Sequence, residues 1–83
     1  MDTVKHEGNR LVELIAKRIQ ELRLARGLTL EKLSFVTGLA KSYLSQIENC
    51  KKNPPINTLT KIAYALGEDV LTLITGEPSV SLS

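Results

Sequence analysis

The chain has 83 residues, a length that allows one small domain and excludes a second hydrophobic core. With 42% hydrophobic and 24% charged residues it has the balance of a globular protein, and with 4% aromatic residues and no Trp its core must be aliphatic. The 11 Lys and Arg against 9 Asp and Glu give a net charge of +2, which by itself does not indicate a nucleic-acid partner.

The first predicted element is a long amphipathic helix. Residues 1–9 are polar and lack an apolar period, so we expect a flexible lead-in there. From Arg10 onward apolar residues recur at helical spacing, and the pattern stops before Gly27, a residue typical of a helix C-terminus. The apolar positions are Leu11, Leu14, Ile15, Ile19 and Leu22.

Two short helices joined by a tight turn are predicted next. Thr29 stands at the N-cap position of the first, which carries Leu33 and Val36 and ends at Gly38. The second covers about residues 41–49, where Leu44 and Ile47 form a narrow apolar stripe. Helices this short, joined by a turn with glycine, must cross steeply.

The remaining segments predict two more helices. A basic loop, residues 51–55, ends in two prolines, which disfavour helix at the preceding residue. A fourth helix then closes at Gly67, and Asp69 can cap a fifth that ends at Gly76. No segment alternates at the period of a strand. We therefore expect an all-α domain of five helices over residues 10–76, followed by a flexible tail or linker start, 77–83.

The third predicted helix projects a wide row of small and polar side chains. The row consists of Ala40, Lys41, Ser42, Ser45 and Gln46. Such a row suits the DNA major groove, which is about 12 Å wide, because Lys can donate to guanine and Gln can pair bidentately with adenine. Lys51 and Lys52 follow at the helix end, where they can meet phosphate groups.

A longer pattern runs through about residues 15–74. It comprises Leu22-Arg23, Gly27-Leu28-Thr29, Leu33, Gly38-Leu39, residues 42–49, Asn53-Pro54, Leu59, Ile62-Ala63 and Ala65-Leu66-Gly67. In this pattern the chain resembles the Cro/C1-type helix-turn-helix family of phage repressors, also called the XRE family. The resemblance implies a compact lambda-repressor-like fold and a sequence-specific, double-stranded DNA-binding transcriptional regulator, a repressor, whose third helix enters the major groove.

The resemblance also implies which residues face DNA. They are Thr29, Leu30, Ala40, Lys41, Ser42, Tyr43, Ser45, Gln46, Asn49, Lys51, Lys52 and Asn53. The chain departs from the family pattern at Leu30, where Gln is common, and at Glu68, where an apolar residue is preferred. Cys50 stands where the family has a Gly helix cap, so we expect a strained or differently closed turn there. Pro55 replaces a Ser-type N-cap.

One acidic residue of the third helix needs a structural partner. Glu48 lies near the inward stripe, where an unpaired carboxylate is costly. The resemblance implies that it pairs with an arginine of the first helix, at the position of Arg23. We expect a bidentate structural ion pair.

The predicted partners are an operator in double-stranded DNA, with a palindromic sequence, and a second copy of the chain. On the fifth helix, Val70 and Leu73 suffice for docking, whereas Leu71 and Ile74 form a second apolar pair about 100° away. We expect Leu71 and Ile74 at a homodimer interface. The same pair could instead dock on a C-terminal sensor domain missing from this chain.

Other function classes find little support in the sequence. A single cysteine and a single histidine offer neither an intramolecular disulfide nor a zinc site, and no catalytic constellation is recognisable. We therefore expect no enzyme, no metal and no cofactor. The Asp-Ser-Leu motif of acyl carrier proteins is absent. Without a signal peptide or membrane span, we expect a cytoplasmic protein with no membrane partner. The alternative left open is a helix-turn-helix module of the antitoxin or anti-repressor type that binds protein.

Overall fold

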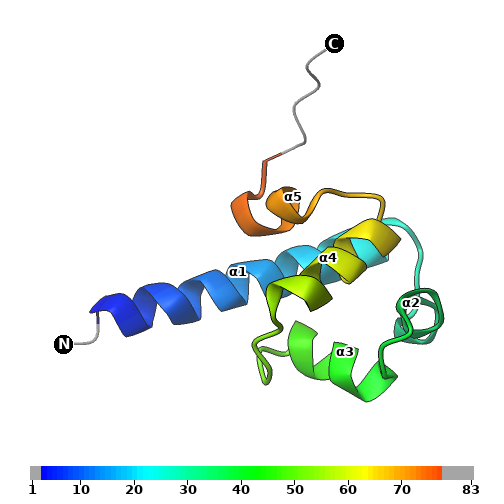
Figure 1. Cartoon of the computed structure of the whole chain (residues 1–83), viewed down its shortest axis with the longest axis horizontal. Coiled ribbons are helices and arrows are strands. Elements are labelled where there is room, and N and C mark those ends of the chain that lie inside the picture. Colours follow the sequence, from blue (N-terminus) through cyan, green and yellow to red (C-terminus); the bar gives the residue numbers. More distant parts are fainter. Residues whose placement is uncertain (1–2, 78–83) are drawn as a thin grey trace, which may run out of the picture.

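The computed structural model describes residues 3–77, with side chains from residue 10 onward, as an arrangement of five helices (Figure 1). Within this range there is no strand, as the sequence predicted. The helices are α1 (Thr3–Ala25), α2 (Leu30–Thr37), α3 (Lys41–Glu48), α4 (Ile56–Ala65) and α5 (Val70–Thr75). Apart from Glu77, the tail expected at 77–83 lies outside the described residues.

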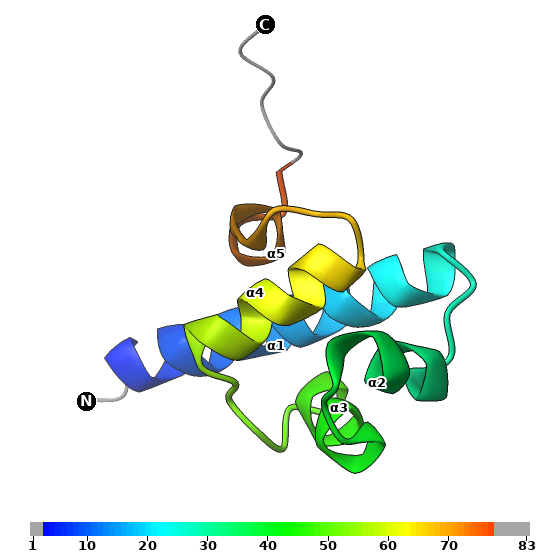
Figure 2. The same ribbon diagram turned by 45° about the vertical axis from the view of Figure 1, so that its right-hand side comes forward.

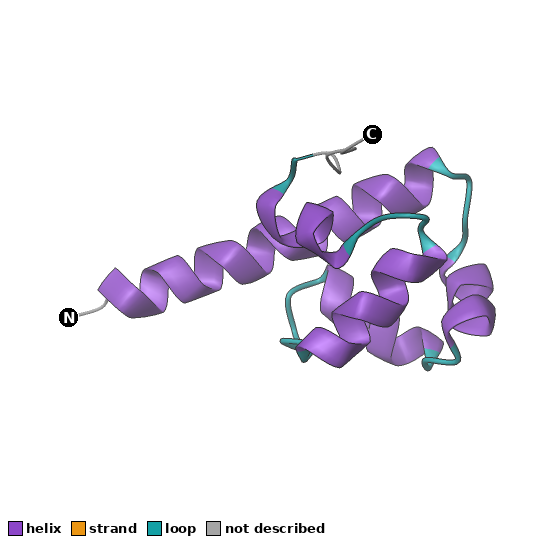
Figure 3. Ribbon diagram, turned by 45° about the horizontal axis from the view of Figure 1, so that its top comes forward, coloured by secondary structure: helices purple, strands orange, loops and turns teal. Residues whose placement is uncertain are grey.

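Helix α1 begins earlier than the sequence pattern predicted. It is helical from Thr3 and not from Arg10, so residues 3–9 extend the helix where we expected a flexible lead-in. Apolar spacing marks only the part of a helix that packs, whereas each residue added to a formed helix gains a backbone hydrogen bond without any tertiary contact. As a result, the N-terminal end of α1 projects beyond the other helices (Figure 3).

The core is aliphatic and draws on all five helices. Its most deeply buried members include Leu33 of α2, Ile62 of α4 and Leu73 of α5, each 0% exposed. The full set of buried hydrophobic residues is Ile15, Ala16, Ile19, Leu33, Leu44, Ile47, Leu59, Ile62, Ala63, Leu66 and Leu73. Val36 of α2 is 52% exposed, and Leu30 of the same helix packs against the core.

Four of the five helices end at a glycine with positive φ, and α3 is the exception. Its final turn places Cys50 at φ +61°. The N–H of Cys50 donates to the Ile47 carbonyl (3.1 Å), and the N–H of Lys51 donates to the Gln46 carbonyl (2.7 Å). These two bonds form a Schellman motif, in which the left-handed position normally holds glycine. The turn therefore has the geometry of a glycine C-cap, and the Cys50 side chain makes that geometry strained.

Replacing Cys50 with glycine is expected to stabilise the domain. The left-handed conformation costs an L-residue about 1–2 kcal/mol, and the extra freedom of glycine in the unfolded chain offsets about 0.5–1 kcal/mol of the gain. The melting temperature should rise by several degrees, since about 1 kcal/mol corresponds to about 4–8 °C in a domain of this size. Thermal melts under reducing conditions measure the effect. Cys50→Ala removes the thiol but keeps the strain, so equal melting temperatures for the two variants would contradict this explanation.

The Arg18 side chain of α1 binds the C-terminal end of α5. The Arg18 guanidinium donates from one nitrogen to the carbonyls of Leu73 (2.8 Å) and Ile74 (3.0 Å). A cation at this position satisfies carbonyls that a helix C-terminus leaves without partners. Gly76 lies so close to the guanidinium that a Cβ there would be 2.5 Å from it. The C-terminal end of α5 is thus fixed against the middle of α1.

Candidate nucleic-acid interface

Helices α2 and α3 cross steeply, as the short connection predicted. In Figure 1, α2 is seen nearly along its axis while α3 runs across the view. In Figure 2, α2 runs across the view and α3 is seen closer to its axis. The turn between them is held by side chains of α2. The Thr37 hydroxyl donates to the Leu33 carbonyl (2.7 Å) and accepts from the Leu39 N–H (3.1 Å). The Ser34 hydroxyl donates to the Leu39 carbonyl. These bonds fix the angle at which α3 is presented.

Helix α3 divides sharply into an apolar and a polar face. Leu44 and Ile47 are each 1% exposed and anchor the helix in the core. The predicted contact residues on the other side are exposed: Ala40, Lys41, Ser42, Gln46 and Asn49. Ser45 is half-buried at the edge of this row. Tyr43 is also half-buried and packs against the core, as its position at the core edge suggested.

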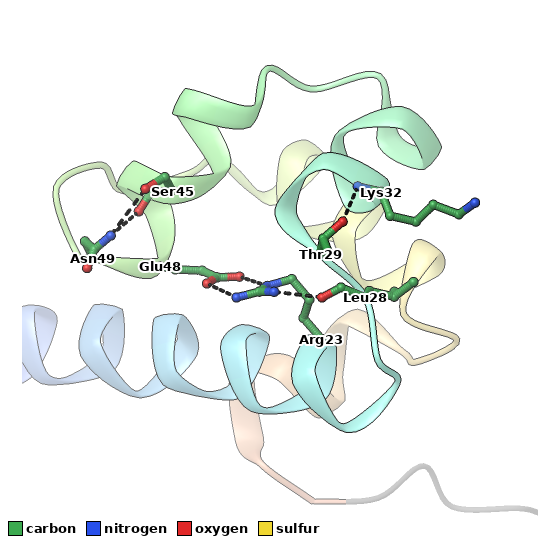
Figure 4. Close-up of polar contacts among 7 residues, drawn as sticks. All are labelled: Arg23, Leu28, Thr29, Lys32, Ser45, Glu48 and Asn49. Carbon is green, nitrogen blue, oxygen red and sulfur yellow. Dashed lines mark hydrogen bonds and ion pairs between the residues drawn. The ribbon is translucent and has the colours of Figure 1, made fainter.

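The polar row contains a hydrogen bond that restricts two of its members. The Asn49 side-chain amide donates to the Ser45 carbonyl (2.8 Å) and lies 3.4 Å from the Ser45 hydroxyl (Figure 4). The amide nitrogen can only donate, so the Ser45 hydroxyl accepts in this contact. The proton of the Ser45 hydroxyl is not used in this contact.

The start of α2 contributes one exposed hydroxyl. Thr29 is the N-cap, and its side chain accepts from the Lys32 N–H at 3.0 Å (Figure 4). Leu30 beside it is half-buried and packs on the core, so this position offers no polar group in place of the amide common in the family. Of these two predicted contact residues, Thr29 is the one whose side chain is exposed.

The segment after α3 brings a concentrated positive charge to the end of the polar row. Lys51, Lys52 and Asn53 are all exposed. The negative end of the helix dipole stabilises positive charges near a helix C-terminus, so it favours lysines at this place. These three residues follow directly after the last turn of α3, and their contact with DNA stays a prediction.

An ion pair between α1 and α3 holds the polar row in place. The Arg23 Nε donates to one Glu48 carboxylate oxygen at 2.7 Å, and a terminal nitrogen donates to the other at 3.0 Å. The remaining terminal nitrogen donates to the Leu28 carbonyl at 2.7 Å (Figure 4). The side chains of Arg23 and Glu48 are 9% and 3% exposed. The hydrogen bond to Glu48 raises the pKa of Arg23 above its ordinary value, although burial acts in the opposite direction.

Two contacts were not visible in the sequence pattern. Glu68, which replaces an apolar residue of the family, accepts from Arg26 at 2.9 Å and is thereby paired with the end of α1. In the sequence pattern, Arg18 looks like one more exposed charge of an amphipathic helix. Its partner Leu73 is 55 residues away in the sequence. Neither partner is close enough in sequence to give a periodic signal.

The two residues of the expected apolar pair on α5 differ in exposure. Leu71 is 64% exposed, whereas Ile74 is half-buried and also packs against the core. Their place at a dimer interface stays a prediction. Helix α5 contacts both α1 and α4. Because a short helix lying against two neighbours is covered over more than one side, residues about 100° apart can both be shielded.

The described part of the chain shows neither of two other kinds of site. None of its helices has the length and hydropathy needed to cross a membrane. Among residues 3–77 no group of three or more His, Cys, Asp or Glu is arranged to hold a metal ion.

Comparison with known proteins places this arrangement in a family. The helix-turn-helix family model HTH_3 matches residues 19–73. The uncharacterised HTH-type transcriptional regulator y4dJ of Sinorhizobium fredii is 35% identical over 76% of this chain and 82% of its own length. The HTH-type transcriptional regulator SinR of Bacillus subtilis is 42% identical over 74% of this chain, and the match spans 56% of SinR.

Solved structures agree with the sequence matches. A crystal structure of SinR, described as the master regulator for biofilm formation, in complex with DNA has a TM-score of 0.66 and 43% identity, covering 71% of this chain and 95% of that one. An HTH_3 family transcriptional regulator from Vibrio cholerae has a TM-score of 0.77 and 34% identity, covering 84% of this chain and 39% of that one. The chain therefore belongs to the HTH_3 helix-turn-helix family, of the XRE (Cro/C1) type, whose relatives named here are transcriptional regulators.

Proposed function

We propose that this protein regulates transcription, as a repressor, by binding a specific sequence in double-stranded DNA through α3. The observation that carries the proposal is the exposed polar row of α3, presented by a hydrogen-bonded turn and anchored from behind by a buried ion pair. The structure of the relative SinR in complex with DNA supports the same use of the fold.

The exposed groups divide into two roles. Lys41, Ser42 and Gln46 carry donors and acceptors suited to base edges in the major groove, and the Ala40 methyl suits the methyl group of thymine. The groups around this row serve the backbone: the hydroxyl of Thr29 and the positive charges of Lys51 and Lys52 fit phosphates.

Selection from a library of random duplexes, followed by sequencing, tests the proposal. We expect an enriched motif of two inverted half-sites whose centres are about 34 Å, or one helical turn, apart. Binding to that motif should weaken steeply with salt, because each phosphate neutralised contributes about 0.9 to the slope of log K against log salt concentration. A library without enrichment would contradict the proposal and favour a module that binds protein.

We further propose that the protein binds its operator as a homodimer in which Leu71 lies at the interface. Leu71 is 64% exposed on α5, and a two-fold dimer would present two copies of α3 to two inverted half-sites.

Leu71→Glu is therefore expected to shift the sedimentation coefficient at micromolar concentration from dimer toward monomer, because the carboxylate would be buried without a partner. Phe35 of α2 is 83% exposed and serves as a matched control, since Phe35→Glu places the same charge on another exposed apolar position. A wild-type protein that sediments as a monomer, or equal effects of the two variants, would reject Leu71 as the interface residue.

A further inference from the structure

The loop between α3 and α4 has backbone hydrogen bonds at its two ends. Lys51 at its start is bonded to the Gln46 carbonyl, and the Pro55 carbonyl at its end accepts from the Leu59 N–H at 3.0 Å. Between them, in the part of the chain that the structure describes, no hydrogen bond joins Lys52 or Asn53 to another residue. The position of the Lys52 ammonium therefore depends on what the loop rests against.

The surface under the loop comes from three helices. A small hollow there is lined by Lys52, Asn53 and Pro54 of the loop, by Val12, Ile15 and Ala16 of α1, and by Ile47 of α3 and Leu59 of α4. Pro54 and Val12 are half-buried, while Ile15 and Ala16 are buried. In Figures 1 and 3 the loop lies beside the part of α1 where the helix leaves the body of the domain. These α1 residues precede the segment, 19–73, that matches the family model.

We propose that Val12 is a positioning residue for DNA binding: its side chain supports the loop and so determines where Lys52 meets a phosphate. Ile15 and Ala16 also belong to the central core, but Val12 is half-buried and lines the hollow two turns before Ile19. This part of α1 thereby contributes to affinity without touching DNA. This inference rests on the proposed function.

A double-mutant cycle between Val12 and Lys52 tests the inference on the selected DNA site. Lys52→Ala should flatten the salt slope by about 0.9, the contribution of one phosphate. Val12→Ala should flatten it partly and weaken binding by about three- to tenfold, a coupling typical of residues that share a contact. In the Lys52→Ala background, Val12→Ala should have almost no further effect on binding.

Two other variants separate positioning from general destabilisation. Val12→Ile keeps a β-branched side chain in the hollow. This variant should therefore retain the wild-type affinity and salt slope. Leu14→Ala truncates a leucine of the same helix that is 41% exposed, and it should leave both quantities unchanged. A wild-type salt slope in Val12→Ala, or the same loss of affinity with and without the Lys52 ammonium, would overturn the inference.

Limited digestion with trypsin gives a second readout that needs no DNA. The loop offers cleavage sites after Lys51 and Lys52, and cleavage requires local freedom of the chain. Val12→Ala should speed cleavage there several-fold relative to Leu14→Ala, with Val12→Ile matching wild type. If the wild type fails to select any DNA while this acceleration is observed, the proposed function falls and the support of the loop stands. Equal cleavage rates for Val12→Ala and wild type would show that Val12 does not hold the loop.

Discussion

Glu48→Ala is expected to remove about 3–5 kcal/mol of stability, because it leaves the buried Arg23 guanidinium without its counter-charge. Both side chains are less than a tenth exposed, and two hydrogen bonds join them. At roughly 0.05–0.15 kcal/mol per residue, a domain of this size has about 4–12 kcal/mol in total. The variant should therefore melt far below the wild type or fail to fold at the temperature of the experiment. Circular dichroism melts measure the effect.

The exposed pair of Arg26 and Glu68 provides the matched control. Its side chains are 36% and 22% exposed, and its distance, 2.9 Å, is comparable to that of the buried pair. Because solvent screens such a pair, Glu68→Ala should cost only about 0–1 kcal/mol. If Glu48→Ala and Glu68→Ala melt at similar temperatures, burial does not determine the strength of these pairs in this fold.

The raised pKa of Arg23 decides how the contribution of the ion pair to stability can be measured. A cation whose pKa is higher in the folded state contributes stability that is present below the unfolded-state pKa and is lost as the pH rises through the folded-state pKa. For Arg23 both values lie above the pH range in which the protein can be handled, because the pKa of a guanidinium is already high and the pairing with Glu48 raises it further. Substitution, and not alkaline titration, is therefore the way to measure this contribution.

Gln46→Ala is expected to relax the DNA preference at a single position of each half-site. An amide that pairs with one base contributes about 1–3 kcal/mol of discrimination, so the selected site should lose roughly 5- to 150-fold in affinity, while duplexes altered at that base lose little. Competition binding with a panel of single-base variants of the selected site measures both effects.

Gln20 offers a control of the same residue type. It is exposed on α1, a different helix from the polar row, and Gln20→Ala should change neither affinity nor preference. If Gln46→Ala weakens every duplex by the same factor, Gln46 does not read a base and acts on the DNA backbone or on the fold.

Much of this fold could be predicted because residues next to the helix ends determine where the helices begin and end. Thr29 caps α2 through its own hydroxyl, and Gly38 ends that helix in a left-handed conformation; both depend on residues within one turn. The strain at Cys50 was also predictable, since a single position in the last turn of α3 determines it. The exposure of Lys41 and Gln46 follows from their spacing relative to Leu44 and Ile47.

Features that depend on distant partners could not be predicted from spacing. Whether Ile74 faces solvent depends on how α5 lies between α1 and α4, which no pattern within α5 records. The pairing of Glu68 with Arg26 joins residues 42 positions apart, and each reads alone as a solvated charge. The N-terminal limit of α1 was missed for the opposite reason, because residues 3–9 extend the helix without any apolar period.

The small size of α5 has a consequence for how the molecule responds to its surroundings. A helix of six residues is too short to persist in water, so α5 exists only while Leu73 is buried and Arg18 holds its last carbonyls. Local unfolding of α5 would disrupt the surface that contains Leu71 and leave α2 and α3 folded. In the proposed homodimer, association of two copies would then be coupled to the folding of α5. Conditions that loosen α5 would weaken that association without altering the residues proposed to contact DNA.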